Sequence, residues 1–167
     1  MIVARKKIRR RRGRDELFVQ QTHDAAAIGA MLRQAGLADP VDFSMTAQCF
    51  LMAYLGDSPV GVVGLETEVD AALLHPLFVL ETARRRGVGA ALVRAARAAA
   101  HARGARTLYA AAGEDAGYFA RFGFAEAEFA ELATSLPASR FPHMRSAEVH
   151  QCLLVSLDIS HDGLVER

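Results

Sequence analysis

Two glycines and three arginines stand where an apolar segment gives way to an alanine-rich helix. Arg84–Arg86 precedes Gly87 and Gly89, and the helix-forming run 88–102 begins between the two glycines. A helix start presents backbone N–H groups without intrahelical partners, and the helix dipole adds to their attraction for anions. Glycine matters here because a β-carbon would keep a ligand off the backbone, and guanidinium groups pair well with phosphate oxygens. The spacing therefore predicts a site for the phosphate or pyrophosphate of a cofactor.

The spacing of these glycines also limits the class of cofactor. Nucleotide-binding loops require Gly-x-Gly-x-x-Gly or Gly-x-x-x-x-Gly-Lys-Ser/Thr. Leu92 stands where the third glycine of the first pattern would fall, and the chain contains no Gly-Lys pair. What is present is Arg84-x-x-Gly87-x-Gly89, followed by Ala90. This motif resembles the acyl-CoA pyrophosphate loop of the GCN5-related N-acetyltransferase (GNAT) superfamily, Gln/Arg-x-x-Gly-x-Gly/Ala. The plain alternative is a basic helix start with two unrelated glycines.

The elements predicted around the motif follow the order of that superfamily. Apolar runs bounded by turn residues indicate strands, and strong helix formers ending at Arg103-Gly104 indicate the helix after the loop. The predicted elements are a helix at 25–36, strands at 48–55, 60–65, 72–80 and 107–111, a helix at 88–102, a short helix ending at Phe122-Gly123-Phe124, and a C-terminal strand at 149–159. The resemblance covers residues 17–158. It implies one α/β domain with a GNAT-like, mixed and partly splayed β-sheet flanked by helices.

The resemblance implies acetyl-CoA as the acyl donor and cosubstrate, with no metal. In the superfamily the thioester lies where two neighbouring parallel strands splay apart, and the strand before the loop offers backbone groups to the pantetheine arm. The implied cofactor-binding residues are Phe78, Val79, Leu80, Arg84, Arg85, Arg86, Gly87, Val88, Gly89 and Ala90. The alternative for the arginines is a solvent-facing basic turn, and we expect Leu77 and Val79 to be core residues in either case.

The residue at the position of the usual proton donor for the leaving thiolate differs from the family pattern. Many members place a tyrosine four residues before the glycine of the Gly-Phe ending, and here that residue is Phe119, with Tyr118 one position earlier. Successive helical residues point about 100° apart, so Tyr118 is either a rotated substitute or a packing aromatic. A well-oriented complex can also rely on proximity and a water relay.

The candidates for the base are Glu66, Glu68 and His75, on strands that line the substrate side in the family. Glu66 follows an apolar strand, and the ordinary pKa range of histidine suits proton transfer. The alternatives are a solvated carboxylate at a strand end and a structural histidine.

A narrower resemblance points to a subgroup that contains N-acetylglutamate-synthase-like enzymes and the GNAT proteins of arsenic-resistance operons. It rests on segments 60–66 and 118–124, on Ser146-Ala147, and on the Ala-Gly-Leu that ends the first predicted helix. Such enzymes acetylate the α-amine of amino acids or their analogues. Two departures affect the substrate side, because 110–115 lacks the subgroup's threonines and 143–145 replaces its Cys-Pro.

These observations predict N-acetylation of the primary amine of a small, amino-acid-like molecule. Arg140 and Arg145 are candidates for binding a substrate carboxylate, while Glu114 or Asp115 would favour a cationic amine. All four can equally be solvated loop residues. The alternative functions are acetylation of a protein or peptide amine and a noncatalytic CoA-binding regulatory module.

Charge divides the chain into an arm and a domain. Residues 1–14 hold eight of the twenty basic side chains and no acid, whereas the remainder carries twelve basic against nineteen acidic residues, a balance of −7. We expect a flexible arm at 1–14, a single domain at 15–160 and a tail at 161–167. The arm can be a solvated tail, attract nucleic acid or anionic lipid, or dock on an acidic partner subunit. Support for nucleic acid as a partner is weak, because no aromatic residues interleave the arginines.

Composition and cysteine usage limit the classes of protein to which the chain can belong. The 167 residues are 51% apolar, which suits one globular domain. No apolar stretch reaches the roughly 18–20 residues that span a membrane, and no apolar core follows the basic N-terminus, so the sequence predicts a cytoplasmic protein. Cys49 and Cys152 lack metal or redox spacing, and the histidines form no ligand cluster. An exposed edge on the predicted strand at 149–159 would allow a homodimer.

Overall fold

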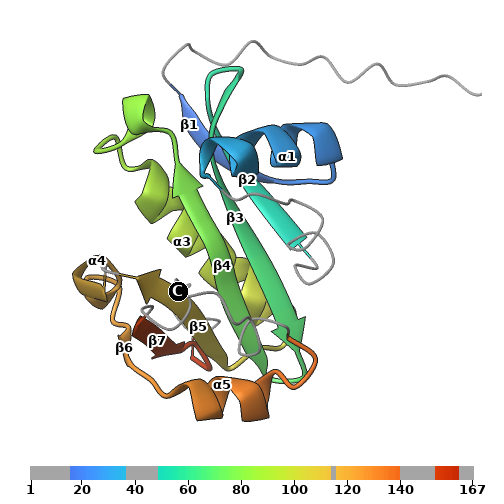
Figure 1. Cartoon of the computed structure of the whole chain (residues 1–167), viewed down its shortest axis with the longest axis vertical. Helices are drawn as coiled ribbons and strands as arrows, with labels where there is room; N and C mark the ends of the chain where they lie inside the picture. The colour runs from blue at the N-terminus through green and yellow to red at the C-terminus, as the bar shows by residue number, and fades with distance from the viewer. Residues whose placement is uncertain (1–15, 37–48, 114–115, 140–152, 162–167) are drawn as a thin grey trace, which may run out of the picture.

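The computed structural model describes residues 16–36, 49–113, 116–139 and 153–161 (Figure 1). Within these residues, seven strands form one sheet in the order β1-β2-β3-β4-β5-β7-β6. The predicted α/β class with a mixed, partly splayed sheet is confirmed. The elements are β1 (Leu17–Thr22), α1 (Ala25–Gln34), β2 (Cys49–Leu55), β3 (Ser58–Glu68), β4 (Ala71–Val79), the 3₁₀ turn η1 (Glu81–Ala83), α3 (Val88–Ala102), β5 (Thr107–Gly113), α4 (Ala116–Ala120), β6 (Ala125–Glu126), α5 (Phe129–Ser135) and β7 (Leu153–Asp158).

The described strands contain one parallel pair, β4 with β5, and the pair separates along its length. Pairing runs from Ala71 opposite Thr107 to Leu74 opposite Ala110, although β4 continues to Val79. Pro76, just beyond the last pair, has no N–H to donate to a ladder. Figure 1 shows the arrowheads of β4 and β5 pointing apart. The splay expected from the family resemblance is thus present between these two strands.

Helices cover both faces of the sheet (Figure 1). Helix α3 packs on one face through an apolar stripe of helical spacing, to which Val88, Leu92 and Ala96 belong. On the opposite face, α1 packs against β2 and β3. The same face carries α5, whose Leu132 lies in a cluster with residues of β4, β5 and β7. The sheet therefore lies between α3 on one face and α1 and α5 on the other, and α5 covers the paired starts of β4 and β5.

The C-terminal strand is not the exposed edge that the dimer argument assumed. Strand β7 pairs with β5 on one side, and Ser156 and Val155 pair with Ala125 and Glu126 of β6 on the other. The short strand β6 has no counterpart among the predicted elements, which is why the edge was placed wrongly. The prediction of a homodimer loses this support, and residues 149–152 of the predicted strand lie outside the described residues.

Candidate active site

The loop between β4 and α3 ends in a helix start without a side-chain cap. Gly87 is the N-cap of α3 and has a φ of 78°, a left-handed conformation that favours glycine. Within the described structure, nothing lies within 4 Å of the position that a β-carbon at Gly87 would take. The N–H of Ala91 donates to the Gly87 carbonyl at 2.9 Å, so the N–H groups of Val88, Gly89 and Ala90 have no intrahelical acceptor. This helix start has both the donors and the space that an anion needs.

The three arginines are exposed and immediately precede this helix start in the sequence. Arg84 Nε donates to the carbonyl oxygen of Val79 at 3.3 Å, which ties the loop to the end of β4. Arg85 has a φ of 62°, so the chain turns through the left-handed region before it does so again at Gly87. Positive charge is thereby concentrated near the donors of α3, as the sequence motif predicted.

The backbone of β4 faces the splay at two residues. The N–H of Leu80 donates to the Val60 carbonyl at 2.9 Å and so points toward β3. Because backbone direction alternates along a strand, Phe78 also points toward β3, while Leu77 and Val79 point toward the side that β5 has left. The Phe78 side chain packs against the cluster under α1, those of Leu77 and Val79 pack on the α3 side, as expected, and Leu80 contacts both clusters. The alternation of backbone direction along a strand would have identified Leu77 as a residue whose N–H and C=O face the splay. Leu77 is not among the cofactor-binding residues that the family resemblance implied.

Tyr118 of α4 reaches the first turn of α3. A β-carbon built at Gly89 would lie 2.5 Å from the Tyr118 hydroxyl oxygen and 3.8 Å from Cγ2 of Val79. The Tyr118 ring makes an edge contact with Phe122, with centroids 5.3 Å apart, and the Arg121 guanidinium lies 5.8 Å from its centroid. Burial raises the pKa of the Tyr118 phenol above its ordinary value, against the opposing effect of Arg121 and Arg94. The hydroxyl is therefore protonated near neutral pH and lies against the first turn of α3.

Glu66 lies on the sheet face that α5 covers. It is 6% exposed, and the register places it opposite Leu73, which in turn pairs with Tyr109. Directly paired residues project on the same side of a sheet, and Leu73 and Tyr109 belong to the cluster that contains residues of α5. The structure thus gives Glu66 a buried position on the face opposite α3, close to where β4 and β5 begin to separate.

His75 lies in an irregularity of β4 at the same level. His75 and Pro76 together lie opposite the single residue Gly64, since Leu74 pairs with Leu65 and Leu77 with Val63. A β-carbon at Gly64 would lie 2.5 Å from the His75 carbonyl oxygen, so only glycine permits this close approach. Burial lowers the pKa of the half-buried His75 imidazole to about 4, and the ring is neutral at pH 7. Bulges of this kind often redirect side chains next to active sites.

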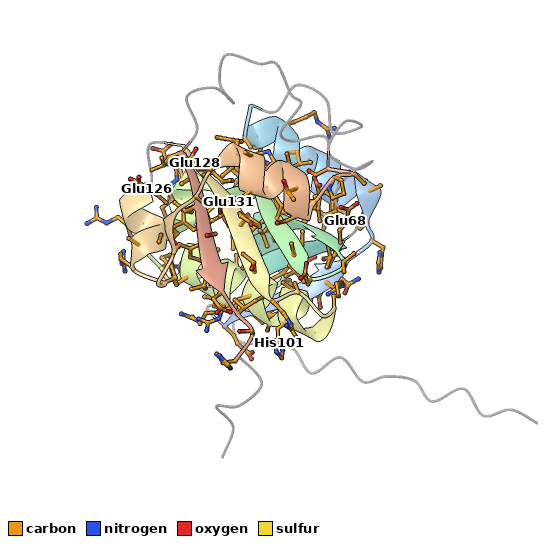
Figure 2. All side chains as sticks on the ribbon, turned by 90° about the horizontal axis from the view of Figure 1, so that it is seen from below. Glu68, His101, Glu126, Glu128 and Glu131 are labelled. Atoms are coloured by element: carbon orange, nitrogen blue, oxygen red, sulfur yellow. The ribbon has the colours of Figure 1, made fainter. Side chains whose placement is uncertain are left out.

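Glu68, the other candidate base, has a structural contact. Its two carboxylate oxygens accept a hydrogen bond from the N–H of Ala138 at 3.1 and 3.3 Å. On the neighbouring part of the same face, the Tyr109 hydroxyl and Ser135 Oγ lie 3.2 Å apart. Figure 2 shows Glu68 away from the acidic side chains of β6 and α5. These two contacts attach α5 and the segment after it to the sheet.

The splayed strand, the basic loop and the helix start follow one another in the order that the family resemblance implied. A model of the acetyltransferase (GNAT) family matches residues 12–124. The chain belongs to the GNAT family. The family expected from the Arg84-x-x-Gly87-x-Gly89 motif is confirmed. No curated protein matches the chain.

Solved structures with the same fold include several acetyltransferases. N-acetylglutamate synthase from Neisseria gonorrhoeae, complexed with coenzyme A and N-acetyl-glutamate, is 20% identical over 87% of this chain, with a TM-score of 0.67. The match spans only 36% of that protein. Rv2747 from Mycobacterium tuberculosis, in complex with CoA, is 19% identical over 84% of this chain and 98% of its own, with a TM-score of 0.66. Arabidopsis thaliana Naa50, in complex with the bisubstrate analogue CoA-Ac-MVNAL, is 17% identical over 85% and 98% of the two chains, with a TM-score of 0.61.

The GNAT chain departs from its family at the position of the usual tyrosine. Phe119 is 3% exposed, and its ring packs edge-on against Phe124 with centroids 5.4 Å apart. Phe119 is therefore a core residue, while its neighbour Tyr118 turns toward α3. Whether Tyr118 substitutes for the family tyrosine as an acid stays a prediction.

Several predicted residues lie outside the described part of the chain. These are Arg140, Arg145, Glu114 and Asp115 of the substrate side, the arm at 1–14, and Cys152. Cys49 is a buried free thiol whose pKa is raised by burial. Among the described residues, no group of three or more His, Cys, Asp or Glu could hold a metal ion. In the same part of the chain, no helix combines the length and apolar character that crossing a membrane would need.

Proposed function

We propose that this GNAT protein transfers the acetyl group of acetyl-CoA to the primary amine of a small, amino-acid-like substrate. The observation that carries the proposal is the continuity of three features along one segment. The outward-facing backbone of Leu77 and Val79 leads through the exposed arginines to the free N–H groups of α3. A strand edge, positive charge and a helix N-terminus suit the amides and the pyrophosphate of CoA.

The chemistry requires a neutral amine and a route for its proton. Acetyl-CoA supplies a thioester carbonyl, to which the amine nitrogen bonds while the carbon–sulfur bond breaks. Glu66 accepts the amine proton, directly or through water, from its buried position on the face opposite α3. His75, neutral at pH 7, orients the amine by hydrogen bonding, since a pKa of about 4 makes it a weak acceptor for an ammonium proton. Tyr118 and water are the two candidate donors for the departing thiolate.

The acceptor follows from two resemblances. The narrower sequence resemblance and the similarity to N-acetylglutamate synthase favour an α-amino acid, with Arg140 and Arg145 binding its carboxylate. The similarity to Naa50 favours a peptide amine as the second candidate. The buried thiol of Cys49 fits a reducing compartment, and we propose the cytoplasm.

Calorimetric titration with acetyl-CoA tests the cofactor site, with Gly87→Glu as the site variant. Glutamate adds a negative charge and a side chain at the helix start, so we expect binding to weaken by about 100-fold or more. Gly36→Glu is the matched control, because Gly36, at the end of α1, has a φ of 74° and no described atom lies within 4 Å of its β-carbon position. The control carries the same backbone strain and added charge away from the loop, and it should bind like the wild type.

Failure to bind acetyl-CoA by a folded wild-type protein would refute the proposal. If acetyl-CoA binds, release of CoA is measured with single amino acids and with short peptides as acceptors. Turnover with amino acids supports the main proposal, and turnover with peptides alone supports the second candidate. Tight binding without turnover on any amine would favour the noncatalytic CoA-binding module.

A further inference from the structure

The two glycines of the loop are required for different reasons. Gly87 satisfies a left-handed backbone and its β-carbon position is open, whereas Gly89 is helical and its β-carbon position is occupied. Real β-carbons are essentially never found within 3.0 Å of another heavy atom, and the Tyr118 hydroxyl oxygen lies 2.5 Å from that position. Gly89 therefore leaves room for a side chain of this protein.

Three elements meet at this contact. Gly89 is the second residue of α3, and its N–H is one of the donors left without an intrahelical acceptor. Tyr118 comes from α4, and Val79, at 3.8 Å from the same position, ends β4. The Tyr118 ring is held on its other sides by Phe122 and by the neighbouring Phe119, with centroids at 5.3 and 5.6 Å. The hydroxyl is thus the point at which α4 contacts the start of the helix that follows the basic loop.

We propose that Tyr118 is a positioning residue for CoA, which sets the first turn of α3 through contact of its hydroxyl with Gly89. The inference rests on the proposed function, because it assigns the contact a role in holding the pyrophosphate. It replaces the role of acid for the thiolate, whose proton then comes from water. Phe119 already fills the place of the family tyrosine with a core side chain, so α4 directs its one hydroxyl to the cofactor loop.

A double-mutant cycle tests the contact. Gly89→Ala sets a methyl group against the hydroxyl and should raise the KM for acetyl-CoA by about tenfold. Tyr118→Phe loses the contact and should raise this KM by about threefold. In the double variant the methyl group no longer meets an oxygen, so its KM should fall back to about that of Tyr118→Phe. Gly117→Ala, also in α4, is the matched control because nothing described lies within 4 Å of its β-carbon position.

The kcat separates positioning from acid catalysis. With a positioning role, Tyr118→Phe acts on the KM for acetyl-CoA and retains kcat within about twofold. A fall in kcat of about 100-fold, with loss of the alkaline limb of the pH profile, would overturn the proposal in favour of an acid. A double variant as impaired as Gly89→Ala would also overturn it, because Gly89 would then be needed by the ligand itself.

Thermal unfolding of the same variants without ligand keeps this inference distinct from the proposed function. If the wild type does not bind acetyl-CoA, the proposed function fails and the positioning role fails with it. The contact itself would still appear as a destabilisation by Gly89→Ala that Tyr118→Phe relieves. If the wild type binds and the cycle shows no coupling in KM, the proposed function stands and the positioning role is refuted.

Discussion

His75 links the environment of a single residue to a measurable dependence on pH. Burial lowers its folded-state pKa to about 4 from an ordinary value of 6.5. The unfolded chain therefore binds more protons between these pH values, and stability is lost as the pH falls through this window. The full shift corresponds to about 3 kcal/mol.

Urea denaturation at pH 7 and pH 4.5 measures this effect in the wild type and in His75→Gln. We expect the variant to lose less of its free energy of unfolding between the two pH values than the wild type does. His23→Gln, which changes an exposed histidine, should retain the wild-type dependence. Equal dependence in wild type and His75→Gln would contradict the lowered pKa of the His75 imidazole.

At the scale of elements, the close approach of β3 to β4 depends on Gly64. A β-carbon there would lie 2.5 Å from the carbonyl oxygen of His75, and backbone cannot move aside as a flexible side chain can. Gly64→Ala should therefore lower the free energy of unfolding by about 1–3 kcal/mol, measured by urea denaturation. Gly117→Ala provides the matched control, since its β-carbon position in α4 is open and alanine favours a helix. A Gly64→Ala protein as stable as the wild type would show that this approach is not tight.

The elements that sequence predicts well are those with a strong periodic signal. Residues 88–102 were predicted as a helix, and α3 has these bounds because its alanine-rich run ends at a basic turn and a glycine. Strand β6 has only two residues and α5 only seven, too few for a period to stand out. The hydroxyl contact of Tyr118 with Gly89 joins residues 29 positions apart through tertiary packing, so local pattern could not predict it. The Arg84-x-x-Gly87-x-Gly89 motif thus predicted the family, whereas a contact formed by tertiary packing could not be predicted.

For the molecule as a whole, the basic arm and the acidic domain have opposite charge. Residues 15–167 carry a balance of −7, and Figure 2 shows three exposed acids, Glu126, Glu128 and Glu131, gathered near β6 and α5. None of the proposed active-site residues belongs to the arm. We expect deletion of residues 1–14 to leave kcat and both KM values within about twofold of the full chain, since salt screens long-range charge interactions at physiological ionic strength.

The arm itself is tested by measuring how the full chain and the variant without residues 1–14 bind a short DNA duplex at low and at high salt. Salt-sensitive DNA binding that is lost with the deletion would favour attraction of nucleic acid by the arm, whereas a solvated tail predicts that the full chain and the deletion variant bind DNA equally poorly. A tenfold loss of turnover after the deletion would contradict the separation of arm and active site.

Beyond Leu74 and Ala110, β4 and β5 no longer pair. The groups of β4 that face this separation belong to the main chain. Leu77 presents the same N–H and C=O there as any residue other than proline would, and the Val79 carbonyl accepts a hydrogen bond from Arg84 Nε. Binding of a cofactor through such groups would depend little on the residue types of the strand and strongly on its backbone conformation. The loop that follows can be recognised from its residue types, whereas the strand can be recognised only from the path of its backbone. The same fold is accordingly found in solved acetyltransferase structures that are only 17–20% identical to this chain.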